Sequence, residues 1–261
     1  MPVVVSYPHS PLTGIVLPMT RRRVRTIAAK VRRQLVEDTL QRRIEPDALA
    51  DATQMLVVND FAFAACWDLS NDVHTREGER VMGATEWDPA EPDSVMVAVN
   101  GLVLGDAARV LSTAAHELGH VIFDAPSWIR TGTDRTTASL ATLPPAELGR
   151  VPQPLSRGDE DDIRRWSEWR ADEFMGGLLT PPTLLKTDFL RLAKRHRLPP
   201  SHVPSRELRG APAFDGHAVE AEAAFEILGT LAERYGVTPT FIRVRLDIYD
   251  LLRVNRPYIV I

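Results

Sequence analysis

The sequence predicts an α+β fold, a mainly helical body with a small antiparallel sheet. Apolar residues recur at helical spacing in several segments, most clearly over residues 107–123. Two short β-rich runs, RVMGATEWD (80–88) and DSVMVAVN (93–100), flank a turn rich in proline and acid, which is typical of a hairpin. The 261 residues are enough to bury a core, and 44% hydrophobic and 25% charged residues are typical of a soluble globular protein.

The elements before the hairpin follow from caps and periodicity. Residues 1–19 are rich in proline, and we expect them to form an N-terminal extension. Thr20 can cap a helix that runs to about residue 37, with apolar side chains along one face. A second helix is expected from Pro46 to about residue 55. The apolar segment 56–66 fits either a strand or a buried helix.

After the helix at 107–123, the composition shifts toward proline, threonine, serine and glycine. We therefore expect an inserted loop over residues 125–160, because connections of this length are uncommon in compact domains unless they are functional or lack fixed structure. A lid or rim over a cleft and an insertion without fixed structure are equally good interpretations. The segment DIRRWSEWRADEFMGGLL then predicts a helix that ends before Pro181. One domain is thus expected over residues 20–182, and a helical C-terminal region over 183–261.

Composition also restricts the class of protein. A net charge of −4 and a pI near 6.0 argue against a protein that mainly coats nucleic acid. The single cysteine, Cys66, rules out an intramolecular disulfide, fits a reducing compartment, and is expected to be buried. No run of about 18 apolar residues exists, and apolar residues precede basic ones at the amino terminus, the reverse of a signal peptide. We expect a cytoplasmic protein.

The most informative stretch is HELGH, residues 116–120. On a helix, His116 and His120 lie one turn apart on the same face, so both imidazoles can bind one metal ion. Glu117 stands beside them, where its carboxylate can take a proton from a metal-bound water, as in the HExxH pattern of zinc peptidases. A catalytic zinc needs a third protein ligand, which must come from elsewhere in the chain.

Glu168 is the best candidate for that ligand. It precedes Asp172 by one helical turn in EWRAD, so one helix face presents two carboxylates. Glu168 can bind the metal while Asp172 accepts the second N–H of a ligating histidine. This combination of HExxH with ExxxD is the arrangement of gluzincin metallopeptidases. Asp124, four residues after His120, is a rival ligand, although a solvated carboxylate at the helix end is the favoured interpretation.

The wider pattern resembles the ImmA/IrrE family of bacterial and phage metallopeptidases. That family places a hairpin before an AHELGH helix, matched by residues 115–120, and then a helix matched by EWRADEFMGGLLTP. The resemblance covers roughly residues 90–182 and implies zinc ligands His116, His120 and Glu168, with Glu117 as the catalytic glutamate.

The resemblance also implies an activity. Family members are zinc-dependent endopeptidases that cleave a helix-turn-helix transcriptional repressor and so release genes of stress response, phage defence or mobile elements. The gap between His120 and Glu168 is longer here than the family leads us to expect, and the excess lies in the inserted loop.

A different function is suggested by the segment LAERYGVTPTFIRVRLDIYDLL (231–252). Two helices joined by a short turn, with Thr238 as a cap, are similar to a helix-turn-helix, and Arg243 and Arg245 are expected to point outward. The alternative is therefore a DNA-binding regulator with a structural or inactive zinc site. The acidic DIYD that follows suits DNA poorly, so nucleic acid is not the favoured partner. A metal-stabilised interaction module without hydrolysis is a third interpretation.

Overall fold

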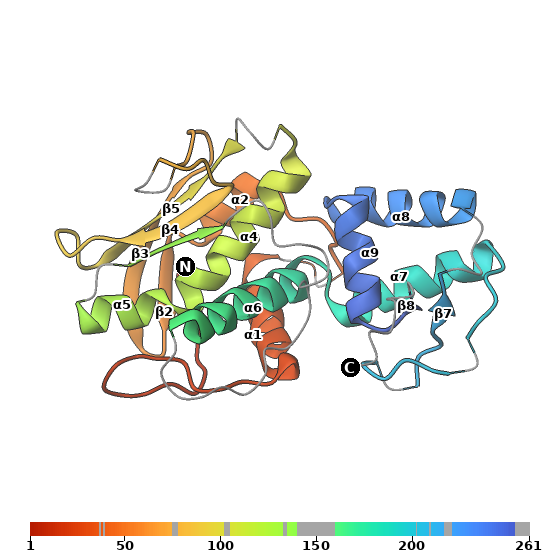
Figure 1. The fold of residues 1–261 in the computed structure, drawn as a ribbon, viewed down its shortest axis with the longest axis horizontal. Coiled ribbons are helices and arrows are strands. Elements are labelled where there is room, and N and C mark those ends of the chain that lie inside the picture. Colours follow the sequence, from red (N-terminus) through yellow and green to blue (C-terminus); the bar gives the residue numbers. More distant parts are fainter. Residues whose placement is uncertain are drawn as a thin grey trace. The chain divides into compact units, whose positions relative to one another are not determined.

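The computed structural model describes residues 1–253 except 37, 39, 75–77, 102–104, 133–134, 140–159, 202, 209 and 217–220. The chain divides into two compact units, Met1–Leu179 and Thr180–Ile261, which are considered separately. Helices and a small sheet give the predicted α+β class (Figure 1). None of the described helices combines the length and the hydropathy needed to cross a membrane.

The first unit is built on a six-stranded sheet in the order β1-β2-β3-β5-β4-β6. The strands are β1 (Val3–Val5), β2 (Met55–Val58), β3 (Phe61–Asp68), β4 (Gly83–Trp87), β5 (Ser94–Val99) and β6 (Arg135–Ser139). The sheet is mixed rather than antiparallel, because β1 runs parallel to β2 and β3 runs parallel to β5. The β4–β5 hairpin folds back so that β5 inserts between β3 and β4, and this makes β5 parallel to β3.

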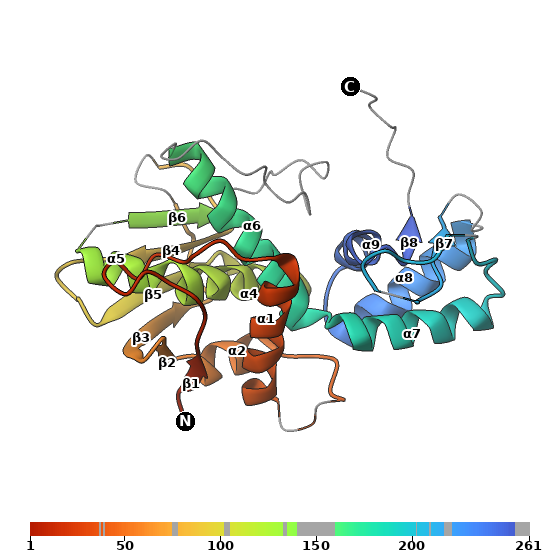
Figure 2. The ribbon, with the colours of Figure 1, turned by 90° about the horizontal axis from the view of Figure 1, so that it is seen from below.

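Helices cover this sheet. They are α1 (Arg21–Leu35), α2 (Pro46–Ala52), α4 (Ala107–Phe123), α5 (Ala125–Thr131) and α6 (Glu160–Leu179). Helix α4 packs against β4 and β5 and also against α6, while α1 packs against α6 (Figure 2). Every residue of α4 from Thr113 to Phe123 is buried, so this helix forms the centre of the unit.

Local signals explain where these helices begin. The Thr20 side chain accepts a hydrogen bond from the backbone N–H of Arg23 at the start of α1. Asp106 caps α4 in the same way, through the N–H of Arg109 at 2.8 Å. Helix α4 therefore starts where its sequence predicts, and its two histidines fall in its second half.

The expected N-terminal extension and the expected inserted loop both contain regular structure. Within residues 1–19, β1 adds a strand to the sheet beside β2. Within residues 125–160, the chain forms helix α5 and then strand β6, which pairs antiparallel with β4 from Gly83↔Ser139 to Trp87↔Arg135. The lid interpretation falls mainly on residues 140–159, outside the described residues.

The apolar segment 56–66 forms most of the antiparallel strands β2 and β3, which settles the choice between strand and helix. Its last residue, Cys66, is exposed rather than buried. Side chains alternate along a strand, and Cys66 lies on the opposite face from the buried Phe63 and Ala65.

The second unit is helical with a small parallel sheet. It contains α7 (Pro182–Arg195), α8 (Ala221–Tyr235), α9 (Pro239–Ile248), β7 (Phe214–Asp215) and β8 (Leu252–Arg253). Thr238 caps α9 as expected, and its hydroxyl accepts from the N–H of Phe241.

The expected outward direction of Arg245 is wrong. Arg245 is buried because it shares the inner face of α9 with Ile242 and Tyr249, its neighbours at helical spacing. Its guanidinium lies over the Tyr249 ring and donates to the Tyr249 hydroxyl, which in turn donates to the carbonyl of Thr180. Arg243 is exposed.

Candidate metal centre

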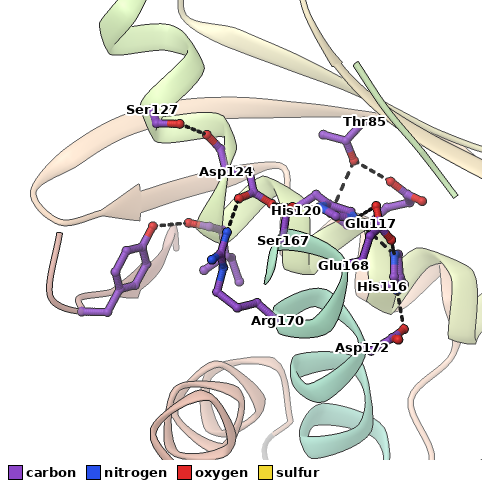
Figure 3. Close-up of polar contacts among 12 residues, drawn as sticks. Thr85, His116, Glu117, His120, Asp124, Ser127, Ser167, Glu168, Arg170 and Asp172 are labelled. Carbon is purple, nitrogen blue, oxygen red and sulfur yellow. Dashed lines mark hydrogen bonds and ion pairs between the residues drawn. The ribbon is translucent and has the colours of Figure 1, made fainter. Parts of the chain in front are cut away.

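Helix α4 presents His116 and His120 on one face, and their Nε2 atoms lie 3.1 Å apart. Glu168 reaches them from α6. Its Oε2 lies 3.3 Å from His116 Nε2 and its Oε1 lies 3.7 Å from His120 Nε2. One ligand atom from each of the three residues lies within 4.8 Å of the others. These side chains could therefore hold one metal ion (Figure 3).

The close approach of α4 and α6 makes this geometry possible. Gly119, between the two histidines, faces Ala171, one turn after Glu168. Two small residues let the helix backbones come together, so a glutamate on one helix reaches the imidazoles on the other. The glycine of HELGH thus has a packing role that its position in the motif does not reveal.

The Nδ1 atom of each histidine, on the side away from Glu168, contacts a carboxylate. His116 Nδ1 lies 3.0 Å from Asp172 Oδ1, as predicted from the spacing of Glu168 and Asp172. His120 Nδ1 lies 2.9 Å from Asp124 Oδ2. In the tautomer in which each Nδ1–H donates to its carboxylate, both Nε2 atoms present a lone pair toward Glu168.

Asp124 is buried, so its interpretation as a solvated carboxylate at the helix end is wrong. Its Oδ2 accepts from the Ser167 hydroxyl at 2.6 Å, and its Oδ1 accepts from Arg170 at 2.8 Å. Burial alone would raise the pKa of Asp124, but the Arg170 guanidinium and the hydrogen bonds from His120 and Ser167 hold it well below its usual range. Asp124 supports His120 rather than replacing Glu168.

The pKa of each of the three candidate ligands is shifted by another of them. Burial lowers the pKa of His116, but its bonds to Asp172 and Glu168 outweigh burial and raise that pKa well above its usual value. Burial also lowers the pKa of His120, but Glu168 and Asp124 outweigh burial, so this pKa lies above its usual value. Burial raises the pKa of Glu168, but His120 and His116 hold it below its usual value. A metal ion taking these ligands would replace imidazole protons, so its uptake releases protons.

Glu117 points from α4 toward strand β4. Its Oε2 accepts from the Thr85 hydroxyl at 2.8 Å, and both residues are fully buried. Burial raises the pKa of Glu117, although the nearby His120 and His116 partly oppose this. Its Oε1 has no hydrogen-bond partner among the described residues. Thr85 was not anticipated, because its sequence context shows only a strand.

The structure brings together all the predicted site residues: His116, Glu117, His120, Glu168 and Asp172. Asp124, Ser167, Arg170 and Thr85 complete the surroundings of these side chains (Figure 3). No protein-family model matches the chain, and no curated protein sequence matches it either. The chemistry of the site is therefore the main guide to function.

Proposed function

We propose that this protein is a zinc-dependent endopeptidase. The observation that carries the proposal is the convergence of His116, His120 and Glu168, with ligand atoms within 4.8 Å of one another and each imidazole backed by a carboxylate. Such backing is the usual second layer of contacts around metal-binding histidines.

The donor set fits zinc. Two imidazole nitrogens and one carboxylate oxygen are the protein ligands of a common type of catalytic zinc site, which leaves a further position for water. When bound, zinc acts as a Lewis acid that lowers the pKa of water and polarises a carbonyl oxygen. Calcium and magnesium prefer sets of oxygen ligands and are poorer candidates for this site.

Glu117 is the natural general base. It follows His116 directly, and its carboxylate is enclosed by protein on all sides. Burial raises the pKa of Glu117 above its usual value, which makes its carboxylate a stronger base. Glu117 would take a proton from the attacking water and pass it to the nitrogen of the cleaved amide.

The substrate class rests on the resemblance to ImmA/IrrE peptidases. In that family the substrate is a helix-turn-helix transcriptional repressor, and its cleavage releases genes of stress response, phage defence or mobile elements. The AHELGH and EWRAD segments that carry the resemblance are also the segments that meet in the structure, on α4 and α6. A cytoplasmic location would suit such a substrate.

The first test is the metal content of the purified protein, measured by plasma mass spectrometry. We expect close to one zinc per chain, with loss or strong weakening in Glu168→Ala. The exposed Glu233 provides a control, because Glu233→Ala leaves the site untouched. Absence of bound zinc, together with no uptake from added zinc, would overturn the proposal.

The second test separates an enzyme from a metal-stabilised interaction module. Glu117→Gln keeps the zinc ligands and removes the base, so we expect it to retain zinc and to lose cleavage of the repressor encoded nearby. Equal cleavage by wild type and Glu117→Gln would exclude the mechanism proposed for Glu117.

A DNA-binding regulator has less support. The capped turn between α8 and α9 fits a helix-turn-helix, but Arg245 is buried against Tyr249 and cannot reach a phosphate or a base. Salt-dependent and sequence-specific binding of DNA, abolished by Arg243→Ala, would favour this alternative over the peptidase.

A further inference from the structure

Strand β4 forms the wall behind Glu117, and two of its residues face the carboxylate. Gly83 and Thr85 lie on the same face of the strand because side-chain positions alternate. The Thr85 hydroxyl donates to Glu117 Oε2 at 2.8 Å. Neither residue belongs to the group of candidate metal ligands.

Gly83 provides the space that the carboxylate occupies. A β-carbon built at position 83 would lie 2.9 Å from Glu117 Oε1, 3.0 Å from Glu117 Cγ and 2.7 Å from Thr113 Cγ2. Real β-carbons do not approach other atoms this closely, so a side chain at this position would force Thr113 and Glu117 to shift. Glycine is needed here for the space it leaves rather than for an unusual backbone conformation.

Strand β4 is paired with a neighbouring strand on both edges. Thr85 pairs with Val97 of β5 on one edge and with Thr137 of β6 on the other, so β4 is an interior strand of the sheet. A hydroxyl fixed to a strand that is paired on both edges constrains its partner more than one on a loop would. Sequence positions 83, 85 and 117 thus meet through the packing of β4 against α4.

The two oxygens of Glu117 have different surroundings. Oε2 is occupied by Thr85, whereas Oε1 is buried and accepts no hydrogen bond from the described residues. Oε1 lies against Gly83, because a β-carbon built at that position would come within 2.9 Å of it. Strand β4 therefore contacts both oxygens, Oε2 through the Thr85 hydroxyl and Oε1 through the space that Gly83 leaves.

We infer that Gly83 and Thr85 are positioning residues that hold the Glu117 carboxylate against β4, in the position from which it acts in the proposed peptide hydrolysis. This inference rests on the proposed peptidase function and adds two residues to it. Thr85 and Gly83 act through Glu117 and touch neither the substrate nor the metal ligands. Their loss should change how well Glu117 works without changing how well the metal binds.

The test uses the full-length protein loaded with cobalt(II), which can replace zinc and has a visible spectrum. Acetohydroxamate is the probe, because a chelating hydroxamate carries a proton that a neighbouring carboxylate can accept. Its affinity is measured by absorption for the wild type and for Thr85→Val, Thr85→Ser, Gly83→Ala and Glu117→Gln. Zinc affinity is measured for each in parallel, and Glu86→Gln, on the other face of β4, serves as control.

We expect Thr85→Val to weaken the binding of acetohydroxamate about 10- to 100-fold, which is the usual effect of losing a hydrogen bond to a charged group. Thr85→Ser restores the hydroxyl and should recover most of the affinity. Gly83→Ala displaces the carboxylate without removing the hydroxyl. Its affinity for acetohydroxamate should therefore fall nearly as far as that of Glu117→Gln. Zinc affinity should stay within about threefold of wild type in every variant, since none of them changes a ligand.

Other results would overturn the inference. Wild-type hydroxamate affinity in Thr85→Val or Glu117→Gln would show that the carboxylate does not face the bound probe. A matching loss of zinc affinity and hydroxamate affinity in Thr85→Val, without recovery in Thr85→Ser, would show a purely structural role. Failure of the wild type to bind zinc or cobalt would instead remove the proposed function itself, and is recognised before any variant is compared.

Discussion

Gly119 of α4 and Ala171 of α6 are in contact at backbone distance, since a β-carbon built on Gly119 would lie 2.8 Å from the α-carbon of Ala171. Glu168 precedes Ala171 by three residues, and His116 precedes Gly119 by three. The contact point is therefore one turn from Glu168 on α6, and on α4 it lies one turn after His116 and directly before His120. The separation of α4 and α6 at this point sets the distance from Glu168 to the two imidazoles.

Gly119→Ala should damage both stability and metal binding. The added methyl group has no room, and overpacking of this kind costs about 1–3 kcal/mol. The helices must separate to relieve the contact, so zinc affinity should fall together with the free energy of unfolding. Chemical denaturation and zinc titration measure the two effects.

Gly229→Ala provides the matched control. Gly229 lies inside α8, and nothing lies within 4 Å of a β-carbon built there. Alanine in a helix interior is favoured over glycine by about 0.5–1 kcal/mol, so this variant should be slightly stabilised and should bind zinc normally. Normal zinc affinity in Gly119→Ala would contradict the proposed link between helix spacing and the metal centre.

Asp124→Asn should weaken zinc binding through His120. The carboxylate holds the Nδ1 side of the imidazole, and loss of such a partner typically reduces metal affinity about 10- to 100-fold. Asp172→Asn should have a similar effect through His116. Isothermal titration with zinc, with the exposed Asp47→Asn as control, measures both.

The two aspartates should differ in their effect on stability. Asp124 also binds Arg170 and Ser167, so Asp124→Asn leaves a largely buried guanidinium without its carboxylate. We expect a larger drop in the free energy of unfolding for Asp124→Asn than for Asp172→Asn when both are measured without zinc. The opposite order would mean that Arg170 finds another partner.

Zinc should stabilise the first unit. A ligand that binds only the folded state adds about 2.7 kcal/mol when its free concentration is 100 times its Kd. Excess zinc should therefore raise the unfolding temperature of the wild type, and a chelator should reverse the change. Glu168→Ala should show little response to either, and an equal response would place the zinc outside the predicted ligands.

The second unit supplies a pH prediction that does not involve the metal centre. Asp250 accepts from the backbone N–H of Arg206 and from Nε of Arg253, both at 2.6 Å. Burial raises the pKa of Asp250, but these hydrogen bonds and the charge of Arg253 outweigh it and hold the pKa below its ordinary value of 3.8. The ionised carboxylate therefore stabilises the folded state above pH 3.8, and this contribution is lost as the pH falls further.

Asp250→Asn tests this directly. The variant should be less stable than wild type near neutral pH, and the difference should shrink as the pH falls below 3.8, the ordinary value of an aspartate. Denaturation curves of both proteins at several pH values measure the difference. A difference that stays constant with pH would show that the charge of Asp250 contributes nothing.

Local sequence patterns predicted the helices and the residues that converge at the candidate metal centre. The apolar periodicity predicts α4, and the i to i+4 spacing of His116 and His120 fixes their common face. The same spacing links Glu168 to Asp172. These features depend only on helix geometry, which is the same in every protein.

Relationships between distant segments could not be predicted in the same way. The sequence shows Asp124 four residues after His120, but its partner Arg170 comes 46 residues later on another helix. Without that cation, a carboxylate at a helix end is most simply read as solvated. Strand β6 and the contact of Thr85 with Glu117 were missed for the same reason, since both depend on which surfaces pack together.

Cys66 gives this protein a practical property. It is the only cysteine in the sequence and its side chain is exposed, on the face of the sheet opposite the buried Phe63 and Ala65. A maleimide dye would therefore attach at one known position in the unaltered protein, away from the candidate ligands. Fluorescence from that single dye could test in real time whether the proposed repressor substrate binds, without the introduction of any new residue.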